Sequence, residues 1–198
     1  MTALRHLRVL LRLRHRVWTD AGGAQIVEFA VSLPLLVVFV VGIFDFSQAI
    51  SVKQKLMNAA RDAARVAASD PATDLGSSST GVPASVSDAN QVVDNYLLSE
   101  KLNDCGLSAA PPIKTAGTLT WVTTATANGC PGTGLVLSVN RGCITKIVSG
   151  ITTINAVQTC VTLSYAYNWT FSRVMGVLGG NATGPSALTA SATAFNEN

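Results

Sequence analysis

An apolar run from Ala24 to Phe44 limits the folds open to this chain more than any other feature, because it is long enough for a helix that crosses a membrane. The run holds one charged residue, Glu28, near its beginning. A charged side chain within a spanning helix costs about 2.5–3.5 kcal/mol on insertion scales. Glu28 is therefore expected to lie at the membrane interface, to be protonated, or to be paired with a partner.

The positive charge of the chain is concentrated before this run. The 198 residues carry a net charge of +3, and residues 1–23 hold five arginines against one acid, Asp20. The remaining residues are close to neutral, so no nucleic-acid surface is indicated. An arginine-rich flank stays on the cytoplasmic side of a membrane, which places the residues after Phe44 on the other side. The leader 1–23 either lies on the inner leaflet as a basic amphipathic helix or has no structure.

The spacing of Gly23, Ala24 and Glu28 resembles that of a type IV prepilin around the point where its leader is removed. Cleavage after Gly23 would make Ala24 the first residue and Glu28 the fifth. Over residues 23–69 the chain resembles the TadE-like pseudopilins of tight-adherence pili. The residues that carry this resemblance are Gly23, Glu28, Phe29, Leu33–Leu36, Gly42, Asp45 and Ala59–Arg65. The segments Val161–Tyr165 and Leu188–Ala192, with Glu197, are similar to the terminal strands of that family.

The resemblance implies a function, partners and a location. It implies processing by a membrane aspartyl prepilin peptidase at Gly23 and Ala24, and assembly through Glu28 and Phe29. The protein would be a structural or assembly subunit of the pilus, and its partners would be other pilin or pseudopilin subunits and the pilus assembly platform. It would cross the inner membrane once, with a cytoplasmic N-terminus and a periplasmic or extracellular C-terminal domain. No cofactor is implied.

Residues 24–69 predict one long helix whose first half, 24–44, spans the membrane. Pro34 is expected to bend it, and Asp70-Pro71 to end it. At about 1.5 Å per residue the helix is much longer than the ~30 Å hydrocarbon core, so its second half projects into water. That half has a narrow apolar seam at helical spacing, which packs either on the chain's own domain or on a neighbouring subunit. The seam residues are Ala49, Val52, Leu56, Ala59, Ala63 and Val66.

The rest of the chain predicts a linker at 70–87 and an α+β domain at 88–198. Ser87 is expected to cap a helix that ends near Leu102. Alternating apolar residues predict strands at Thr118–Thr126, Leu135–Asn140, Gln158–Trp169 and Ala187–Phe195, whereas Thr145–Val157 is ambiguous. The short apolar segment Arg173–Gly180, a helical turn that the glycines would stop, either covers a sheet edge, which we favour, or faces a membrane or a partner. The fold class is therefore α+β, with the long helix packed on a small antiparallel sheet.

All four cysteines lie after the span, where an even number favours two disulfides. We favour Cys105 with Cys130 and Cys143 with Cys160, since each pair closes a modest loop. The cysteines lack the two-residue spacing of a zinc knuckle, and both histidines lie in the leader, so no metal site is expected. Without a histidine in residues 24–198 a general base is missing, and we expect no enzymatic activity.

Two further accounts of the N-terminal segment stay open. In one, the leader is never removed and the protein is an uncleaved, membrane-anchored envelope domain for binding or scaffolding. In the other, an ordinary signal peptidase cuts after Ser47-Gln48-Ala49 and releases a soluble domain. The second account is weaker, because the apolar run is long for a signal sequence and Glu28 would be unexplained.

Overall fold

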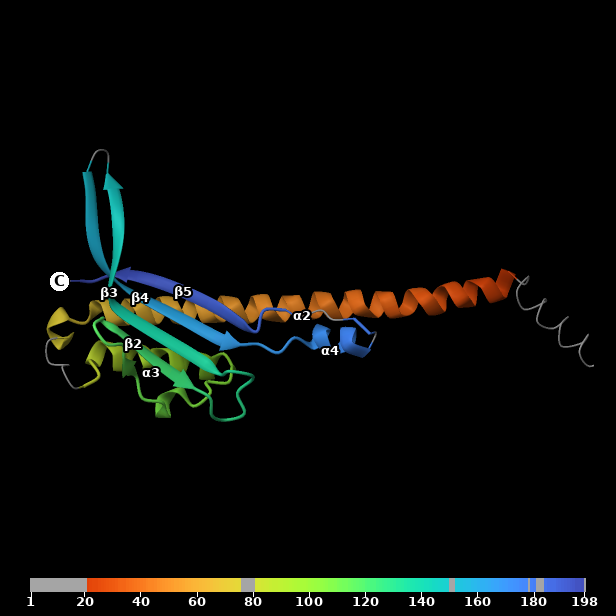
Figure 1. The fold of residues 1–198 in the computed structure, drawn as a ribbon, viewed down its shortest axis with the longest axis horizontal. Coiled ribbons are helices and arrows are strands. Elements are labelled where there is room, and N and C mark those ends of the chain that lie inside the picture. The colour runs from red at the N-terminus through yellow and green to blue at the C-terminus, as the bar shows by residue number, and fades with distance from the viewer. Residues whose placement is uncertain (1–20, 76–80, 150–151, 178, 181–183, 198) are drawn as a thin grey trace, which may run out of the picture. The chain divides into compact units, whose positions relative to one another are not determined.

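The computed structural model describes residues 21–75, 81–149, 152–177, 179–180 and 184–197, so most of the predicted leader lies outside the described residues. The chain forms two compact units. One consists of Met1–Phe46 and Thr170–Ala182, and the other of Ser47–Trp169 and Thr183–Asn198. The fold is α+β as predicted, with a long apolar N-terminal helix and an antiparallel sheet (Figure 1).

The long helix α2 runs from Ala21 to Ser69 with Pro34 inside it. Its residues up to Phe46 belong to the first unit and those from Ser47 to the second. The helix ends directly before Asp70-Pro71, as expected, because a proline ring disfavours helical dihedrals in the residue before it. It is already helical at Ala21, the first described residue, which lies before the expected start at Ala24.

Helix α3, Ala84–Ser99, begins earlier than the sequence suggested, and Ser87 is not its cap. Pro83 occupies the N-cap position, while the backbone N–H of Ser85 donates to Oδ2 of Asp74 at 3.0 Å. Asp74 lies in the short 3-10 helix η1, Ala72–Leu75, inside the segment expected to be a linker. A carboxylate from another element thus satisfies one of the first N–H groups of α3. A second 3-10 helix, η2, covers Leu107–Ala109.

Five strands form an antiparallel meander in the order β1-β2-β3-β4-β5. Their bounds are β1 Ile113–Lys114, β2 Thr120–Ala125, β3 Leu135–Ser149, β4 Thr152–Ala166 and β5 Ala187–Phe195. Leu137 pairs with Leu163 and Val139 with Val161, so their side chains lie on the same buried face. β4 ends at Ala166, before the expected Trp169.

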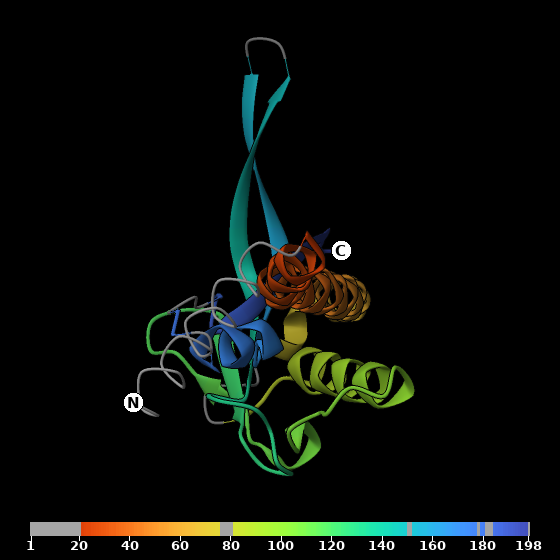
Figure 2. The same ribbon diagram turned by 90° about the vertical axis from the view of Figure 1, so that its right-hand side faces the viewer.

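The ambiguous stretch Thr145–Val157 belongs to a long hairpin. β3 and β4 stay paired from Cys143 with Gln158 to Ser149 with Thr152. Of these residues Gln158 still pairs with Phe195 of β5, and the pairs beyond it have no partner in β2 or β5. This arm, residues 143–149 and 152–158, projects from the sheet in Figures 1 and 2. The pairing register shifts between Asn140 and Cys143, which places a bulge at the base of the arm.

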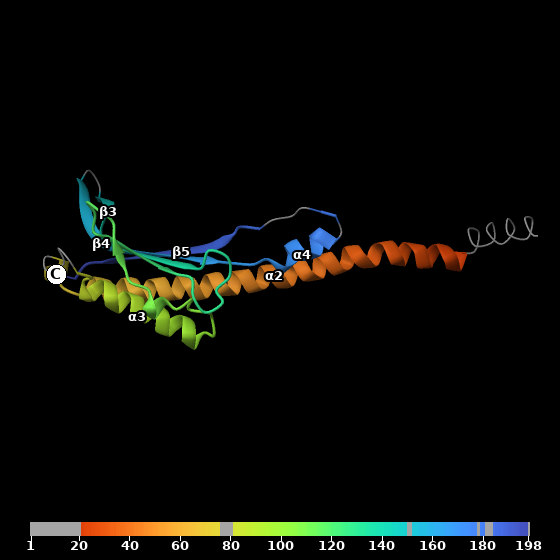
Figure 3. The same cartoon turned by 60° about the horizontal axis from the view of Figure 1, so that its bottom comes forward.

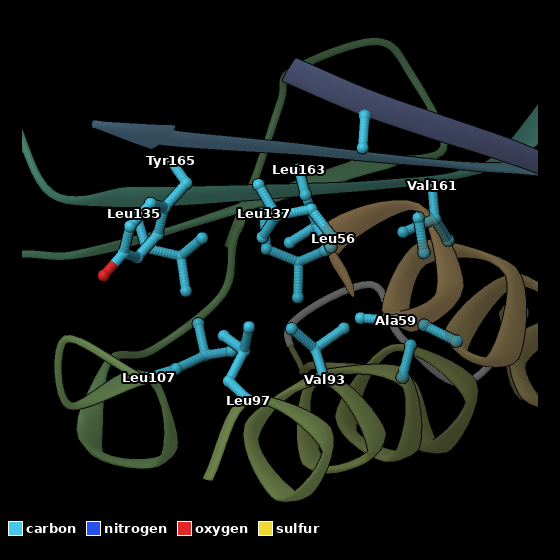
Figure 4. Packing of buried hydrophobic residues seen from close by; sticks show 14 of the residues in the cluster. Leu56, Ala59, Val93, Leu97, Leu107, Leu135, Leu137, Val161, Leu163 and Tyr165 are labelled. Carbon is cyan, nitrogen blue, oxygen red and sulfur yellow. The ribbon is translucent and has the colours of Figure 1, made fainter. Parts of the chain in front are cut away.

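The core of the second unit lies between the sheet and two helices. Leu56 and Ala59 of α2 and Val93 and Leu97 of α3 are fully buried with side chains of β3 and β4, which face them in Figure 4. Figure 3 shows α3 beside the later part of α2. The amphipathic faces of both helices and one face of the sheet are therefore buried together.

Two disulfides complete this unit, in the pairing favoured from the sequence. Cys105, in the loop after α3, is bonded to Cys130 between β2 and β3. Cys143 of β3 is bonded to Cys160 of β4 at the base of the arm. Each bond limits the freedom of the unfolded chain, which stabilises the fold by roughly 2–4 kcal/mol.

Candidate membrane and assembly segment

The predicted processing residues lie in the first turns of α2. Gly23 is half-buried and Ala24 is exposed, and the helix passes through both from Ala21. The bond between Gly23 and Ala24 thus lies within helical backbone in the described part of the chain.

Glu28 and Phe29 are both exposed, and Phe29 keeps 66% of its accessible surface. The carboxylate of Glu28 has no hydrogen-bond or ion-pair partner among the described residues, whereas its backbone carbonyl accepts a bond from Oγ of Ser32 at 2.6 Å. The two predicted assembly residues thus lie on the surface of the helix, without a side-chain partner among the described residues.

The residues around Glu28 form an apolar surface that the described residues leave uncovered. The span candidate begins at Gly23, its most apolar window has a mean hydropathy of 2.6, and none of that window is buried. Such a helix, close to the N-terminus, is suited to anchor the protein in a membrane. The exposed large side chains are Ile26, Val27, Phe29, Val31, Leu33, Leu35, Leu36, Val37, Phe39, Val40, Ile43 and Phe44.

Helix α4, Thr170–Val177, packs against α2 at the end of the apolar run. Oδ2 of Asp45 accepts a hydrogen bond from the backbone N–H of Phe171 at 2.9 Å, and Asp45 is only 4% exposed. Gly42 lies one turn before Asp45 on α2, and a Cβ at Gly42 would be 3.5 Å from the Phe171 ring. The segment expected to cover a sheet edge therefore begins with a helix on α2, where Asp45 caps it.

The seam on the second half of α2 faces the chain's own domain. Leu56, Ala59 and Ala63 are fully buried, and Ala49 is nearly so. Val52 and Val66 are half-buried. All six residues belong to the second unit, so this part of α2 contributes to the domain core. The uncovered apolar surface lies earlier along the same helix.

Arg141 is a buried residue that the sequence patterns did not single out. Its side chain is 1% exposed, and its Nη1 donates to the carbonyl of Ala67 and to Oγ1 of Thr159, the latter at 3.1 Å. Its Nη2 donates to the carbonyl of Asp70 at 2.8 Å. These carbonyls belong to the end of α2, where carbonyl groups lack helical partners and a positive charge is favourable. Arg141 lies at the bulge, directly after Asn140, which pairs with Cys160 of β4. A bulge interrupts the alternation of a strand, so sequence periodicity does not reveal that this side chain is buried.

The charges near this helix end influence one another. Burial lowers the pKa of the Arg141 guanidinium, and the carboxylates of Asp74 and Asp70 oppose that shift. Burial also raises the pKa of Asp70, with the negative charges of Asp88 and Asp74 acting in the same direction and Arg141 against them. The cluster is thus a partly desolvated charge network at the junction of helix and sheet.

A family model described as TadE-like protein matches residues 23–65. No curated protein and no solved structure gives a significant match. The matched residues include Glu28, Gly42, Asp45 and the buried alanines of the seam, whereas α3 and the sheet lie outside the match. The resemblance found in the sequence is confirmed for this segment of the chain.

Proposed function

Because residues 23–65 match the TadE-like family, we propose that this protein is a pseudopilin, a structural or assembly subunit of a tight-adherence pilus. In this proposal a prepilin peptidase removes residues 1–23. The mature chain is then held in the inner membrane by α2, with its sheet domain outside the cytoplasm. Its partners are other pilin or pseudopilin subunits and the assembly platform, and it is not an enzyme.

The observation that carries this proposal is the position of Glu28. Its carboxylate is exposed, without a partner among the described residues, within a helical surface that is otherwise apolar. Trimming after Gly23 gives Ala24 a positive α-amino group. When subunits associate, the Glu28 carboxylate of one and the Ala24 amine of the next can approach in the apolar bundle. Each charge then offsets the desolvation cost of the other.

The experiment compares three variants of the full chain expressed with its pilus system. Gly23→Leu should retain the leader, as measured by intact mass of the protein recovered from membranes, whereas the matched control Gly22→Leu should be trimmed. Glu28→Ala should be trimmed and should insert into the membrane, but it should fail to enter pili. Removing one partner of such a buried pair costs about 3–5 kcal/mol, because the other charge is left without compensation.

A second candidate function is that of an uncleaved envelope domain tethered by α2. The continuous helix from Ala21 through Gly23 and Ala24 favours it, because a peptidase would have to unwind this turn. Native protein that keeps residues 1–23, together with normal piliation by the Glu28→Ala variant, would replace the pilus proposal with this one.

A further inference from the structure

Helix α4 begins at the point on α2 where the charge-free run ends. After Glu28 the next charged residue along the chain is Asp45. Its carboxylate accepts the N–H of Phe171 in the first turn of α4. Asp45 thus satisfies one of the N–H groups that lack a partner at the start of a helix, and its negative charge opposes the positive end of the helix dipole. The contact ties α4 to this position on α2.

The packing extends from Asp45 back into the apolar run. Val38, Val41 and Gly42 are half-buried, whereas the other residues from Ala24 to Phe44 are exposed. The Phe171 ring lies beside Gly42, 3.5 Å from the position that a Cβ there would take, which is an ordinary van der Waals distance. Figures 1 and 3 show α4 beside this part of α2, within the first unit. The aromatic ring therefore reaches residues that belong to the spanning segment.

The length of the apolar run sets the depth of this contact. A hydrocarbon core of about 30 Å takes about 20 apolar residues of helix, which corresponds to Ala24–Phe44. Asp45 then lies at the level of the lipid headgroups, and so does the beginning of α4. The exposed neighbours Ile43 and Phe44 continue the lipid-facing surface up to the same level.

The charge of α4 suits a phospholipid surface. Its one charged residue, Arg173, is exposed, and Thr170–Val177 contains no acidic residue. Phe171, Val174 and Met175 provide apolar surface that is only half-buried. We propose that α4 is a second membrane contact of this protein, an interfacial helix that reaches the bilayer surface and presents Arg173 to lipid phosphates. The inference rests on the proposed membrane anchor and adds a second segment to it.

The test uses the full-length protein in vesicles of phosphatidylcholine with a variable fraction of phosphatidylglycerol. Gly176 is exposed on α4, and a Cβ at this position would have open space around it, so Gly176→Cys accepts a fluorescent label. Ser191→Cys, on an exposed position of β5, is the matched control. The Gly176 label should be quenched by phospholipids brominated near the headgroup and protected from iodide. The Ser191 label should show the opposite behaviour.

Arg173 variants test the role of its charge. Arg173→Glu should lower the lipid-borne quenching of the Gly176 label several-fold and remove its dependence on the fraction of phosphatidylglycerol, whereas Arg173→Lys should retain both. Equal iodide quenching at Gly176 and Ser191 would overturn the inference. So would a label at Gly176 that is shielded from iodide without quenching by lipid, since protein would then cover α4.

Extraction of the same vesicles with alkaline carbonate separates this inference from the proposed function. Protein that carbonate releases would show that α2 is no membrane anchor, and the proposed function would fail with the inference. Protein that stays in the membrane while the Gly176 label is fully open to iodide would disprove the role of α4 alone.

Discussion

Arg141 of β3 donates a hydrogen bond from its guanidinium to the backbone carbonyl of Ala67, so a strand residue satisfies the C-terminal end of helix α2. The same side chain reaches the carbonyl of Asp70. Thr159 Oγ1, which accepts from Arg141, donates in turn to Oδ1 of Asn196 at 2.6 Å. Helix, sheet and C-terminal residues of the second unit are thereby joined through one buried cation.

Replacing Arg141 should therefore destabilise the second unit. Arg141→Met leaves the carbonyls of Ala67 and Asp70 without this donor, which costs about 1–3 kcal/mol for each buried group left unsatisfied. The measurement is the free energy of unfolding of the full chain in detergent, by chemical denaturation. Lys146→Met, at an exposed position of the arm, is the control and should change little. Similar losses in both variants would show that Arg141 does not hold the helix end.

The buried alanines of α2 predict an overpacking effect. Ala59 and Ala63 are fully buried, so Ala59→Leu or Ala63→Leu should lower the free energy of unfolding by about 1–3 kcal/mol. Lys53→Gln, at an exposed position of the same helix, should be mild. Thermal unfolding of the three variants checks this, and equal melting temperatures would mean that the seam faces solvent.

The disulfide pairing can be tested by peptide mapping without reductant. Fragments should be linked through Cys105 with Cys130 and through Cys143 with Cys160. Replacing both members of either pair by serine should cost roughly 2–4 kcal/mol of stability. Crossed linkages, or four free thiols in protein from its native envelope, would contradict the pairing.

Asp94 of α3 predicts a pH dependence of stability. Burial raises the pKa of this carboxyl, and the hydrogen bond and charge of Asp104 act in the same direction against a bond from Ser108. The folded protein therefore binds this proton more tightly than the unfolded chain does. The resulting contribution of Asp94 to the free energy of unfolding is fully present below its ordinary pKa of 3.8, and it is lost as the pH rises through the raised pKa. Asp94→Asn should remove this loss.

The measurement for Asp94 is the melting temperature as a function of pH from 3 upward. Asp94→Asn should gain stability relative to the native protein as the pH approaches neutrality. The exposed Glu197 provides the control, Glu197→Gln, which should follow the native curve. A curve for Asp94→Asn that runs parallel to the native one would contradict the prediction.

The long helix and the sheet could be predicted from the sequence because periodic patterns report burial on one face. Leu135, Leu137 and Val139 alternate as a half-buried strand must, and Asp70-Pro71 ends a helix by sterics alone. Thr145–Val157 stayed ambiguous because the described side chains on both faces of the arm lie outside the core. Ile144 and Val157 on one face and Thr145 on the other are exposed, so no alternation was required.

The parts that could not be predicted depend on contacts between distant residues. Ser87 was chosen as a cap because capping was judged from neighbours in sequence, whereas the carboxylate that meets the start of α3 comes from Asp74. Asp45 belongs to the family pattern, yet its contact with Phe171 joins residues 126 positions apart. The same reasoning applies to Arg141, whose partners follow from tertiary packing.

The two disulfides also determine how this domain would respond to mechanical tension. A force applied between the N-terminal end of α2 and the end of the sheet could not extend the chain between two bonded cysteines. The bonded cysteines are 25 residues apart in one disulfide and 17 in the other. At about 3.3–3.6 Å per residue, the chain within each disulfide loop has a contour length of several nanometres, which stretching cannot extend while the bond is intact. The second unit would therefore extend under tension by less than its full contour length. Reduction of the two disulfides would allow the chain to extend further.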